Sequence, residues 1–236
     1  MHAWDHVKPH QHPWGQLAYC SNGVLTMVTD AGTFVVPPQQ ALWLPAGVWH
    51  ESYCRYGGDF RSVYIDLSYQ TQLGENTKLL HVDALLREMI LEICRWPEDY
   101  ALTPSTLRFV DVFIDRLQQA PSSHFFIPKP QDPRLALIIS ELHAHPGCTK
   151  TLEQWAEIVG ASSRTLNRLF HQSFTMSFRL WKQNLRALRA VELLTEGQSQ
   201  QRIAEQLGFA SSAAFNSAFK KVFGTSPGRY LTNGQK

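Results

Sequence analysis

The sequence has no hydrophobic run long enough to cross a membrane and no paired cysteines. None of its apolar stretches approaches the ~18 consecutive residues of a transmembrane helix. The polar, histidine-rich amino terminus MHAWDHVKPHQH lacks the features of a secretory signal. The four cysteines, Cys20, Cys54, Cys94 and Cys148, are scattered singly with no CxxC pair. We therefore expect reduced thiols in a cytoplasmic protein without a membrane partner, and neither a disulfide framework nor a zinc knuckle.

Charged residues are also scarce, at 18% of the chain, whereas hydrophobic residues make up 44%. A chain of 236 residues with that apolar content can bury substantial cores, which excludes disorder and predicts one large or two smaller domains. Residues 131–236 carry 13 Lys and Arg against 7 Asp and Glu, a net of +6, and residues 1–130 carry 9 against 13, a net of −4. The basic half could face a polyanion, although this excess is also ordinary for a segment of that length.

Residues 14–69 have the pattern of a β-domain. Short apolar runs, separated by turn residues, predict a series of strands: QLAYC, VLTMV, TFVV, ALWL and SVYIDL. Asn22-Gly23 stands between the first two runs and predicts a type I′ hairpin, because that turn needs positive φ at both central residues. Several short strands at even spacing predict a sandwich or a small barrel.

Residues 76–120 change to helical spacing. One apolar stripe, which ends at Trp96-Pro97, comprises Leu79, Val82, Leu86, Met89, Ile90 and Ile93. A second stripe, after a Thr103-Pro104 start, comprises Leu107, Val110, Ile114 and Leu117. The stripes could cover the barrel or form the seam of a homodimer, and the pattern favours neither alternative.

Proline and helical periodicity divide the rest of the chain. Residues 120–132 hold three prolines and two serines, so we expect residues 121–132 to be a linker without a regular element, between domains of residues 1–120 and 133–236. From Pro133 onward the pattern is helical throughout. Helices are expected at about 133–144, 151–159, 162–173, 177–195, 200–207, 211–222 and 226–231.

The helical region contains one unit twice. The motif A-E-x-[VL]-G occurs at residues 156–160 and again at 204–208, an offset of 48. The offset then becomes 49, and the matching positions are Leu166, Asn167, Phe170, Phe174, Ser177 and Trp181 with Phe215, Asn216, Phe219, Phe223, Ser226 and Tyr230. So many matched positions indicate a duplicated supersecondary unit.

Each copy has the pattern of a helix-turn-helix. A short helix ends at a glycine, Gly160 or Gly208, and a serine-rich turn follows. The second helix begins at a serine N-cap, which is Ser162 or Ser163 in the first copy and Ser211 in the second. Because the second helix of this motif enters the major groove, we expect the chain to bind double-stranded DNA.

The exposed faces of the two second helices differ in their capacity to read bases. Arginine can bond guanine and asparagine can bond adenine in a bidentate manner, which favours the first unit as the main base reader. The second unit has fewer such groups and is expected mostly to hold phosphate and read shape, although both faces could be ordinary solvated surfaces. The base-readout candidates are Arg164, Thr165, Asn167 and Arg168 in the first unit and Ser212, Ala213, Asn216 and Ser217 in the second. The phosphate candidates are Ser163, Arg179, Lys182, Arg186, Lys220 and Lys221.

A single helix, residues 177–195, is expected to join the two units. About 19 residues at 1.5 Å per residue span roughly 28 Å. That length is somewhat shorter than the ~34 Å repeat of B-DNA. The helix could place both recognition helices in successive major grooves, provided that the DNA bends or the protein strains.

The run IAEQLGFASSAAFNSAFKKVFGTSPGRY resembles the second helix-turn-helix signature of AraC/XylS-type bacterial transcription regulators. The I-A-x-x-L-G-F segment, the serine cap, the F-x3-F spacing and the G-x-S-P end appear in order, and residues 133–231 as a whole are similar to the family's DNA-binding domain. Ala213 departs from the polar side chains frequent in the family. The resemblance implies an α+β protein of two domains. An N-terminal cupin-like β-barrel with helices would sense an effector and dimerise, and a C-terminal all-α double helix-turn-helix would bind DNA.

The N-terminal half also holds a histidine pattern that resembles the two cupin motifs. His10, His12 and Gln16 form H-x-H-x3-Q, and His50 ends a P-x-G-x2-H segment. Gln16 stands where a glutamate is usual, and the glycine that opens the second motif is not evident. Three imidazoles could still hold a divalent metal ion. The alternative is a vacant barrel whose histidines bond to polar neighbours or to an effector.

Aromatic side chains near these histidines could line an apolar pocket for a small organic effector, although some could belong to the core. The candidates are Trp14, Tyr19, Trp43 and Trp49. Two functions of different class remain, a ligand-responsive transcription regulator and a metal-dependent cupin enzyme fused to helices. The duplicated unit favours the regulator, because an enzyme has no need of two matched helix-turn-helix units, and we therefore expect no catalytic residues.

Overall fold

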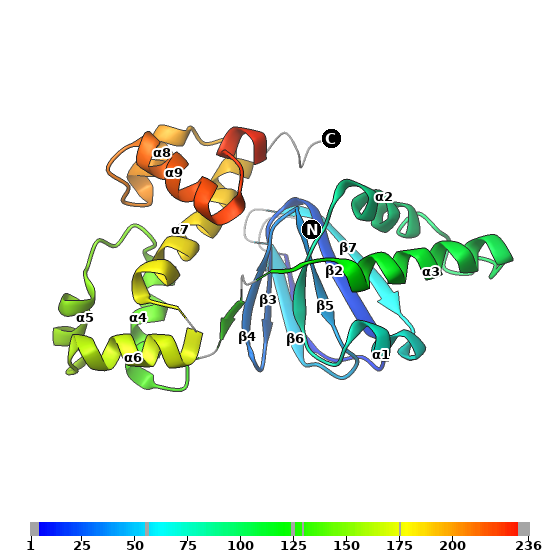
Figure 1. Ribbon diagram of the computed structural model, residues 1–236, viewed down its shortest axis with the longest axis horizontal. Helices are drawn as coiled ribbons and strands as arrows, with labels where there is room; N and C mark the ends of the chain where they lie inside the picture. The colour runs from blue at the N-terminus through cyan, green and yellow to red at the C-terminus, as the bar shows by residue number, and fades with distance from the viewer. Residues whose placement is uncertain (1–4, 55–56, 124–125, 129, 175, 231–236) are drawn as a thin grey trace. The chain divides into compact units, whose positions relative to one another are not determined.

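The computed structural model describes residues 5–54, 57–123, 126–128, 130–174 and 176–230. The chain divides into two compact units, Met1–Phe126 and Ile127–Lys236 (Figure 1). The boundary falls within the segment that the sequence predicts to be a linker. None of the helices in the described part of the chain is both long and apolar enough to cross a membrane.

Two five-stranded sheets form the first unit. One has the order β1 (Asp5–His10), β6 (His50–Cys54), β3 (Leu25–Thr29), β4 (Gly32–Val36) and β10 (Phe126–Pro128). The other has the order β7 (Gly58–Ile65), β2 (Gly15–Gly23), β5 (Gln40–Leu44), β8 (Lys78–His81) and β9 (Ser122–Ser123). In the first sheet the neighbouring pairs β1–β6, β6–β3 and β3–β4 are antiparallel. In the second sheet all neighbouring pairs are antiparallel. Over the described residues these are two sheets, and no strand pairing that would close them into a barrel is detected.

The central strands are buried on both faces. In β5, Leu42 and Leu44 point into the core between the sheets, whereas Ala41 and Trp43 point to the opposite side. Alternate side chains of a strand face opposite ways, so a continuously apolar strand requires a cover on each side. The inter-sheet core also contains Cys20 and Cys54, and all four cysteines are free thiols.

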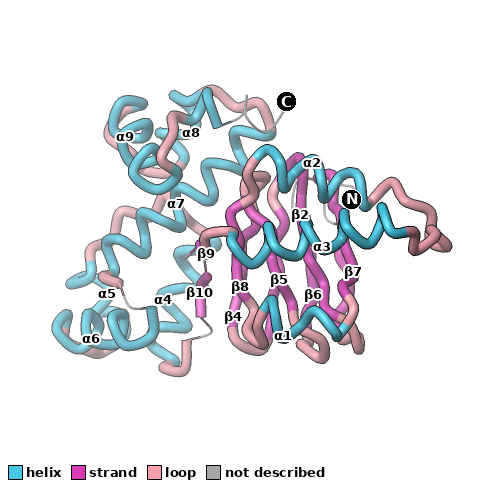
Figure 2. Tube along the Cα trace, turned by 45° about the vertical axis from the view of Figure 1, so that its right-hand side comes forward, coloured by secondary structure: helices cyan, strands magenta, loops and turns pink. Residues whose placement is uncertain are grey.

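Helices supply the second cover. They are the 3-10 turn η1 (Leu67–Tyr69), α1 (Gln70–Leu73), α2 (Ala84–Ile93) and α3 (Pro104–Gln119). The helices α2 and α3 lie over the sheet that contains β2 and β5 (Figure 2), and their buried side chains share one core with Tyr19 and Trp43. Of the two alternatives for the apolar stripes, the inward residues such as Met89 and Ile114 therefore cover the sheet.

Three local predictions in this unit were wrong. Leu79 belongs to strand β8, because residues 78–81 pair with β5 at the sheet edge instead of starting a helix. Asn22-Gly23 makes no hairpin, because β2 and β3 lie in different sheets and the chain crosses between them there. The predicted linker is not wholly irregular, since β9 and β10 fall within it.

The second unit consists of helices. They are α4 (Pro133–Ala144), α5 (Leu152–Val159), α6 (Ser163–Phe174), α7 (Phe178–Thr195), α8 (Gln200–Gln206) and α9 (Ser212–Phe223). Each bound lies within one residue of its prediction. Residues 227–230 are also helical, and the last residue of that predicted helix lies outside the described ranges. The long helix α7 connects the pair α5–α6 with the pair α8–α9 (Figure 1).

Aromatic side chains build the core of each helix pair. In the first pair, Phe170 and Trp181 pack with Leu166 beneath α6. In the second pair, the rings of Phe215 and Phe219 are in contact and fully buried. These are duplicated positions of the repeat, so the predicted duplication is confirmed as two equivalent packed units.

Candidate nucleic-acid interface and histidine cluster

The turns of the two helix-turn-helix units have the same construction. Gly160 has φ +64° and Gly208 has φ +67°, the left-handed region that favours glycine. The hydroxyl of Ser162 accepts from the backbone N–H of Thr165 at 3.1 Å, and that of Ser211 accepts from Ala214 at 3.1 Å. Each second helix is therefore capped by the first serine of its turn.

The outward face of α6 carries the predicted base readers. Arg164, Asn167 and Arg168 are exposed, whereas the side chain of Thr165 is half-buried beside the cap. Within the part of the chain that the structure describes, the hydrogen bond found for the guanidinium of Arg168 is a long one, 3.4 Å, to Gln172 on the same helix. These side chains can therefore reach a ligand without breaking a strong bond within the protein.

The outward face of α9 is less free. The amide of Asn216 donates to Gln200 Oε1 at 2.9 Å and to the carbonyl of Ser212 at 2.8 Å, which ties α9 to the start of α8. Ala213 and Ser217 are exposed but short. The engagement of Asn216 within the unit was not expected from the residue types, which made Asn216 a candidate base reader.

A groove of about 860 Å³ runs over the first half of α7 and is lined by residues of both α6 and α9. Its basic side chains are Lys150, Arg179, Lys182, Arg186 and Lys221. Among the described residues that line it there is no acidic one. The pKa of Lys182 is lowered from its ordinary value by burial and then by the charge of Arg186. An anion in the groove would relieve that repulsion.

The other phosphate candidates lie at the edges of this surface. Lys220 and Lys221 are exposed near the end of α9, and Arg179 is exposed near the start of α7. Ser163 is half-buried at the start of α6. Lys182 already donates to the carbonyl of Lys150 at 2.9 Å.

Arg186 is engaged differently from the other basic residues. Its Nε donates to the carbonyl of Pro146 at 3.0 Å, and its Nη2 donates to that of Cys148 at 3.0 Å. Longer contacts reach Gly147 at 3.5 Å and Gly208 at 3.4 Å. Burial lowers its pKa from the ordinary value. The guanidinium therefore joins the loop before α5 to the turn of the second unit.

The two loops that Arg186 joins also touch directly through glycines. A Cβ atom on Gly147 would lie 2.2 Å from the carbonyl oxygen of Gln206, and one on Gly208 would lie 2.5 Å from that of Gly147. Neither Gly147 nor Lys150 was predicted as a functional residue. The sequence does contain one feature that could have pointed to Lys150, because it directly precedes Thr151, the N-cap of α5.

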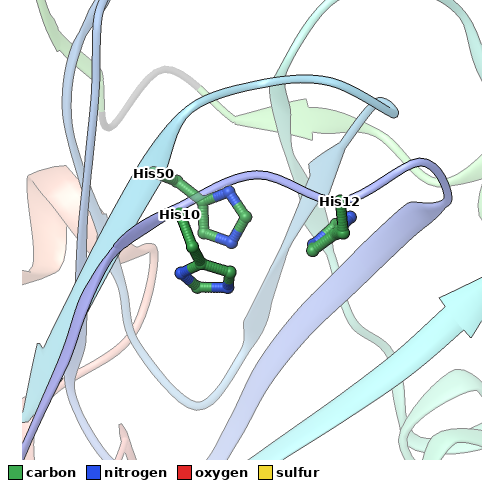
Figure 3. A group of neighbouring side chains, drawn as sticks. All are labelled: His10, His12 and His50. Carbon is green, nitrogen blue, oxygen red and sulfur yellow. The ribbon is translucent and has the colours of Figure 1, made fainter.

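The histidines predicted as a group do come together in the first unit. His10 ends β1 and lies opposite His50 at the start of β6, and His12 belongs to the connection from β1 to β2 (Figure 3). Ring centroids are 4.4 Å apart for His10 and His50, and 5.0 Å apart for His12 and His50. Burial lowers the pKa of His50, as do the neighbouring charges of His10 and His12 when they are protonated.

Gln16 also belongs to this cluster. Its Oε1 lies 2.9 Å from His12 Nε2, and its Nε2 lies 2.6 Å from Ser62 Oγ. Gln16, His12 and His50 are all buried. The H-x-H-x3-Q spacing therefore did identify residues that meet in space.

The four aromatic pocket candidates do not converge. Tyr19 and Trp43 are fully buried in the core between the sheet and the helices. The indole of Trp43 also donates to the carbonyl of Gly74 at 2.9 Å. Trp14 and Trp49 are exposed on the surface. Trp14 stacks on His12 with centroids 5.2 Å apart. Tyr19 and Trp43 are therefore removed from the pocket candidates and belong to the core, which was the alternative left open for some of the four.

Comparison with known proteins finds two matching family models. A helix-turn-helix domain matches residues 155–233, and an AraC-like ligand binding domain matches residues 1–178. The chain is 32% identical over 222 residues to the HTH-type transcriptional regulator NimR of Escherichia coli (strain K12), which covers 94% of this chain and 81% of NimR. It is 32% identical over 131 residues to the regulator RipA of Corynebacterium glutamicum, which covers 56% of this chain and 37% of RipA.

Solved structures give weaker likenesses. ToxT from Vibrio cholerae has a TM-score of 0.44 and 14% identity, covering 99% of this chain and 96% of that one. The DNA-binding domain of AdpA, in complex with a target DNA, has a TM-score of 0.40 and 28% identity over 42% of this chain and 90% of that one.

Proposed function

This chain belongs to the AraC family of helix-turn-helix transcriptional regulators, and from that premise we propose which of its residues contact DNA and where it is regulated. The chain is a DNA-binding transcription regulator and carries an AraC-like ligand-binding domain. The relatives named above are transcriptional regulators and not enzymes, which decides against the metal-dependent enzyme.

The observation that carries the proposal is the groove between α6 and α9. Five basic side chains and no acidic one line it over the described residues, although the whole chain is nearly neutral at +2. Phosphate contacts supply most of the sequence-independent affinity for DNA. We assign Arg179, Lys220 and Lys221 to the phosphates, because their side chains are exposed.

Base readout is assigned mainly to α6. Arg164 and Arg168 are exposed and can bond guanine in a bidentate manner, and Asn167 can do the same for adenine. In α9 the amide of Asn216 is engaged within the unit, which supports a role in shape recognition for the short side chains around it.

The first unit is proposed to be the regulatory part. We propose that it is cupin-like, binds a small-molecule effector and forms a homodimer in the cytoplasm. Leu85, Leu102 and Leu107 are exposed apolar side chains on or beside α2 and α3, which supports a seam there. An effector can shift DNA binding only by binding one arrangement of the protein more tightly than another.

Two measurements test these assignments. Selection of bound sequences from random duplex DNA should yield one preferred site. On that site, the double variant Arg179→Ala/Lys221→Ala should flatten the slope of log K against log salt by about 2, because each phosphate contact contributes about 0.9. Arg108→Ala, an exposed charge on α3, is the matched control and should leave the slope unchanged. A slope that stays the same in both variants contradicts the groove as the phosphate site.

The dimer is tested separately. Leu107→Lys should convert a dimer into a monomer in sedimentation experiments, because it buries a charge in the seam. If the Leu107→Lys protein sediments with the same mass as the wild type, Leu107 is not part of a dimer interface.

A further inference from the structure

The tautomers of the clustered histidines are set by the backbone. The Nδ1 atom of each ring lies within hydrogen-bond distance of a carbonyl oxygen two residues away. The pairs are His10 with Lys8 at 2.9 Å, His12 with Trp14 at 2.7 Å and His50 with Val48 at 2.9 Å. A carbonyl oxygen can only accept, so each Nδ1 carries the hydrogen and each neutral ring keeps its lone pair on Nε2.

The rings also converge. One nitrogen from each of the three histidines lies within 4.8 Å of the other two (Figure 3). Lone pairs brought this close in a buried place repel one another unless a cation or a donor lies between them. An imidazole whose Nδ1–H is held by a carbonyl is also the usual state of a metal-bound histidine, because that bond fixes the ring and its tautomer.

Gln16 adds an oxygen beside this group. With Nδ1 of His12 as the donor, Gln16 Oε1 faces a lone pair on His12 Nε2 at 2.9 Å. Two ligands bound to one ion at about 2.1 Å lie about 3 Å apart when they are at right angles. The bond from the Gln16 amide to Ser62 holds the oxygen on this side. Exchanging the oxygen and nitrogen of the Gln16 amide would give His12 Nε2 a hydrogen-bond donor. The lone pairs of His10 and His50 would still face each other without a donor or cation between them.

We propose that His10, His12 and His50, with the amide oxygen of Gln16, bind one divalent late transition-metal ion. The set of three imidazoles and one neutral oxygen suits Co²⁺, Ni²⁺, Cu²⁺ or Zn²⁺. Mg²⁺ and Ca²⁺ are disfavoured, because they take oxygen ligands and the cluster contains no carboxylate. This inference concerns the first unit alone and does not depend on DNA binding.

The structure also provides an optical reporter. The indole of Trp14 stacks on the His12 ring with an interplanar angle of 4°, and its edge meets Tyr64. A paramagnetic ion held by His12 would therefore quench the fluorescence of Trp14. Trp14→Phe should abolish that part of the quenching and leave metal uptake unchanged.

The test uses the full chain, stripped with a chelator and titrated calorimetrically with Co²⁺, Ni²⁺, Zn²⁺ and Mg²⁺. We expect one transition-metal ion per chain and no heat from Mg²⁺. His10→Ala and His50→Ala should weaken binding by at least about tenfold. His6→Ala is the matched control, because His6 lies on the same β1–β6 ladder but bonds to Glu51 at 2.9 Å. The His6→Ala protein should bind the transition-metal ions with the affinity of the wild type.

A gain-of-affinity variant guards against loss of folding. Gln16→Glu replaces the neutral oxygen by a carboxylate, so it should bind the ion more tightly, which misfolding cannot do. Wild-type protein that takes up none of the three transition metals overturns the proposal, as does unchanged affinity in both His10→Ala and His50→Ala. A Gln16→Glu protein that binds no more tightly removes Gln16 from the ligand set.

Discussion

Replacing Arg186 by methionine distinguishes a clamp from a phosphate contact. The methionine keeps most of the packing of the arginine stem but cannot donate to the carbonyls of Pro146 and Cys148. If the guanidinium holds the loop before α5 against the turn of the second unit, the change should loosen that junction. If the guanidinium instead contacts a DNA phosphate, the substitution should weaken DNA binding and leave the junction unchanged.

The size of the effect follows from the contacts. Two bonds of 3.0 Å from a charged donor contribute about 1.5–3 kcal/mol each. The contacts at 3.4 and 3.5 Å add little, and because the half-buried site lets water reach the freed carbonyls, the lower figure applies. The guanidinium also lies over the Phe209 ring at 5.5 Å, which is worth about 0.5–1 kcal/mol. The total is about 3.5–4 kcal/mol, of which about 3 kcal/mol comes from the two bonds to the loop before α5.

Hydrogen exchange of the intact chain measures this loss where it occurs. A change of about 3 kcal/mol corresponds to a factor of about 100 in an opening equilibrium. The amide of Cys148, which donates to the carbonyl of His145 at 2.9 Å, reports on the loop before α5 that the two short bonds hold. Its protection should fall by about two orders of magnitude in Arg186→Met.

Arg179→Met is the matched control. It lies two turns earlier on the same face of α7 and lines the same groove, but it is exposed. It should flatten the salt dependence of DNA binding by about 1 without changing exchange near Cys148. The clamp is refuted if Arg186→Met behaves in the same way as Arg179→Met.

Three further substitutions probe separate parts of the second unit. Arg168→Ala should weaken specific DNA binding by about 1–3 kcal/mol and relax one base preference; unchanged specific affinity in a gel-shift titration contradicts the readout assigned to α6. Lys220→Ala should lower affinity for all sequences and reduce the salt slope by about 1, and an unaltered slope removes Lys220 from the phosphate contacts. Asp132→Ala should cost about 1 kcal/mol in a urea melt, because it deletes the N-cap of α4. Its hydrogen bonds to Arg134 also hold the pKa of Asp132 at about 2, below the ordinary 3.8. That stabilisation is complete above pH 4 and is lost as the pH falls toward 2, so Asp132→Ala should lack this acid-dependent loss.

The helical half was predictable because its signals are local. Pro133 stands at the first position of α4, serine or threonine caps begin the later helices, and left-handed glycines end the first helix of each unit. Each signal acts within one turn of the chain, so a single sequence is enough to place the bounds. The exposed face of α6 follows from the same periodicity.

The β half was less predictable because its pairing is remote. Leu79 fits a helical stripe as well as a strand, and only the edge of β5 made it a strand. Asn22-Gly23 has the residues of a hairpin, but the adjoining strands pair with β7 and with β6, far along the chain. Tyr19 and Trp43 could line a pocket or a core, and the packing of α2 and α3 over the sheet settled that they belong to the core.

By itself the sequence determined the duplicated helix-turn-helix, its caps and its polar faces, because hydrogen bonds between residues three or four apart depend only on neighbours. Tertiary structure decided everything that joins distant segments. It set three histidine rings side by side with their Nδ1 atoms bonded to the backbone. It also brought the guanidinium of Arg186 against carbonyls of two loops. The physical reason is that such contacts depend on how far-apart strands and helices pack, which no local spacing specifies.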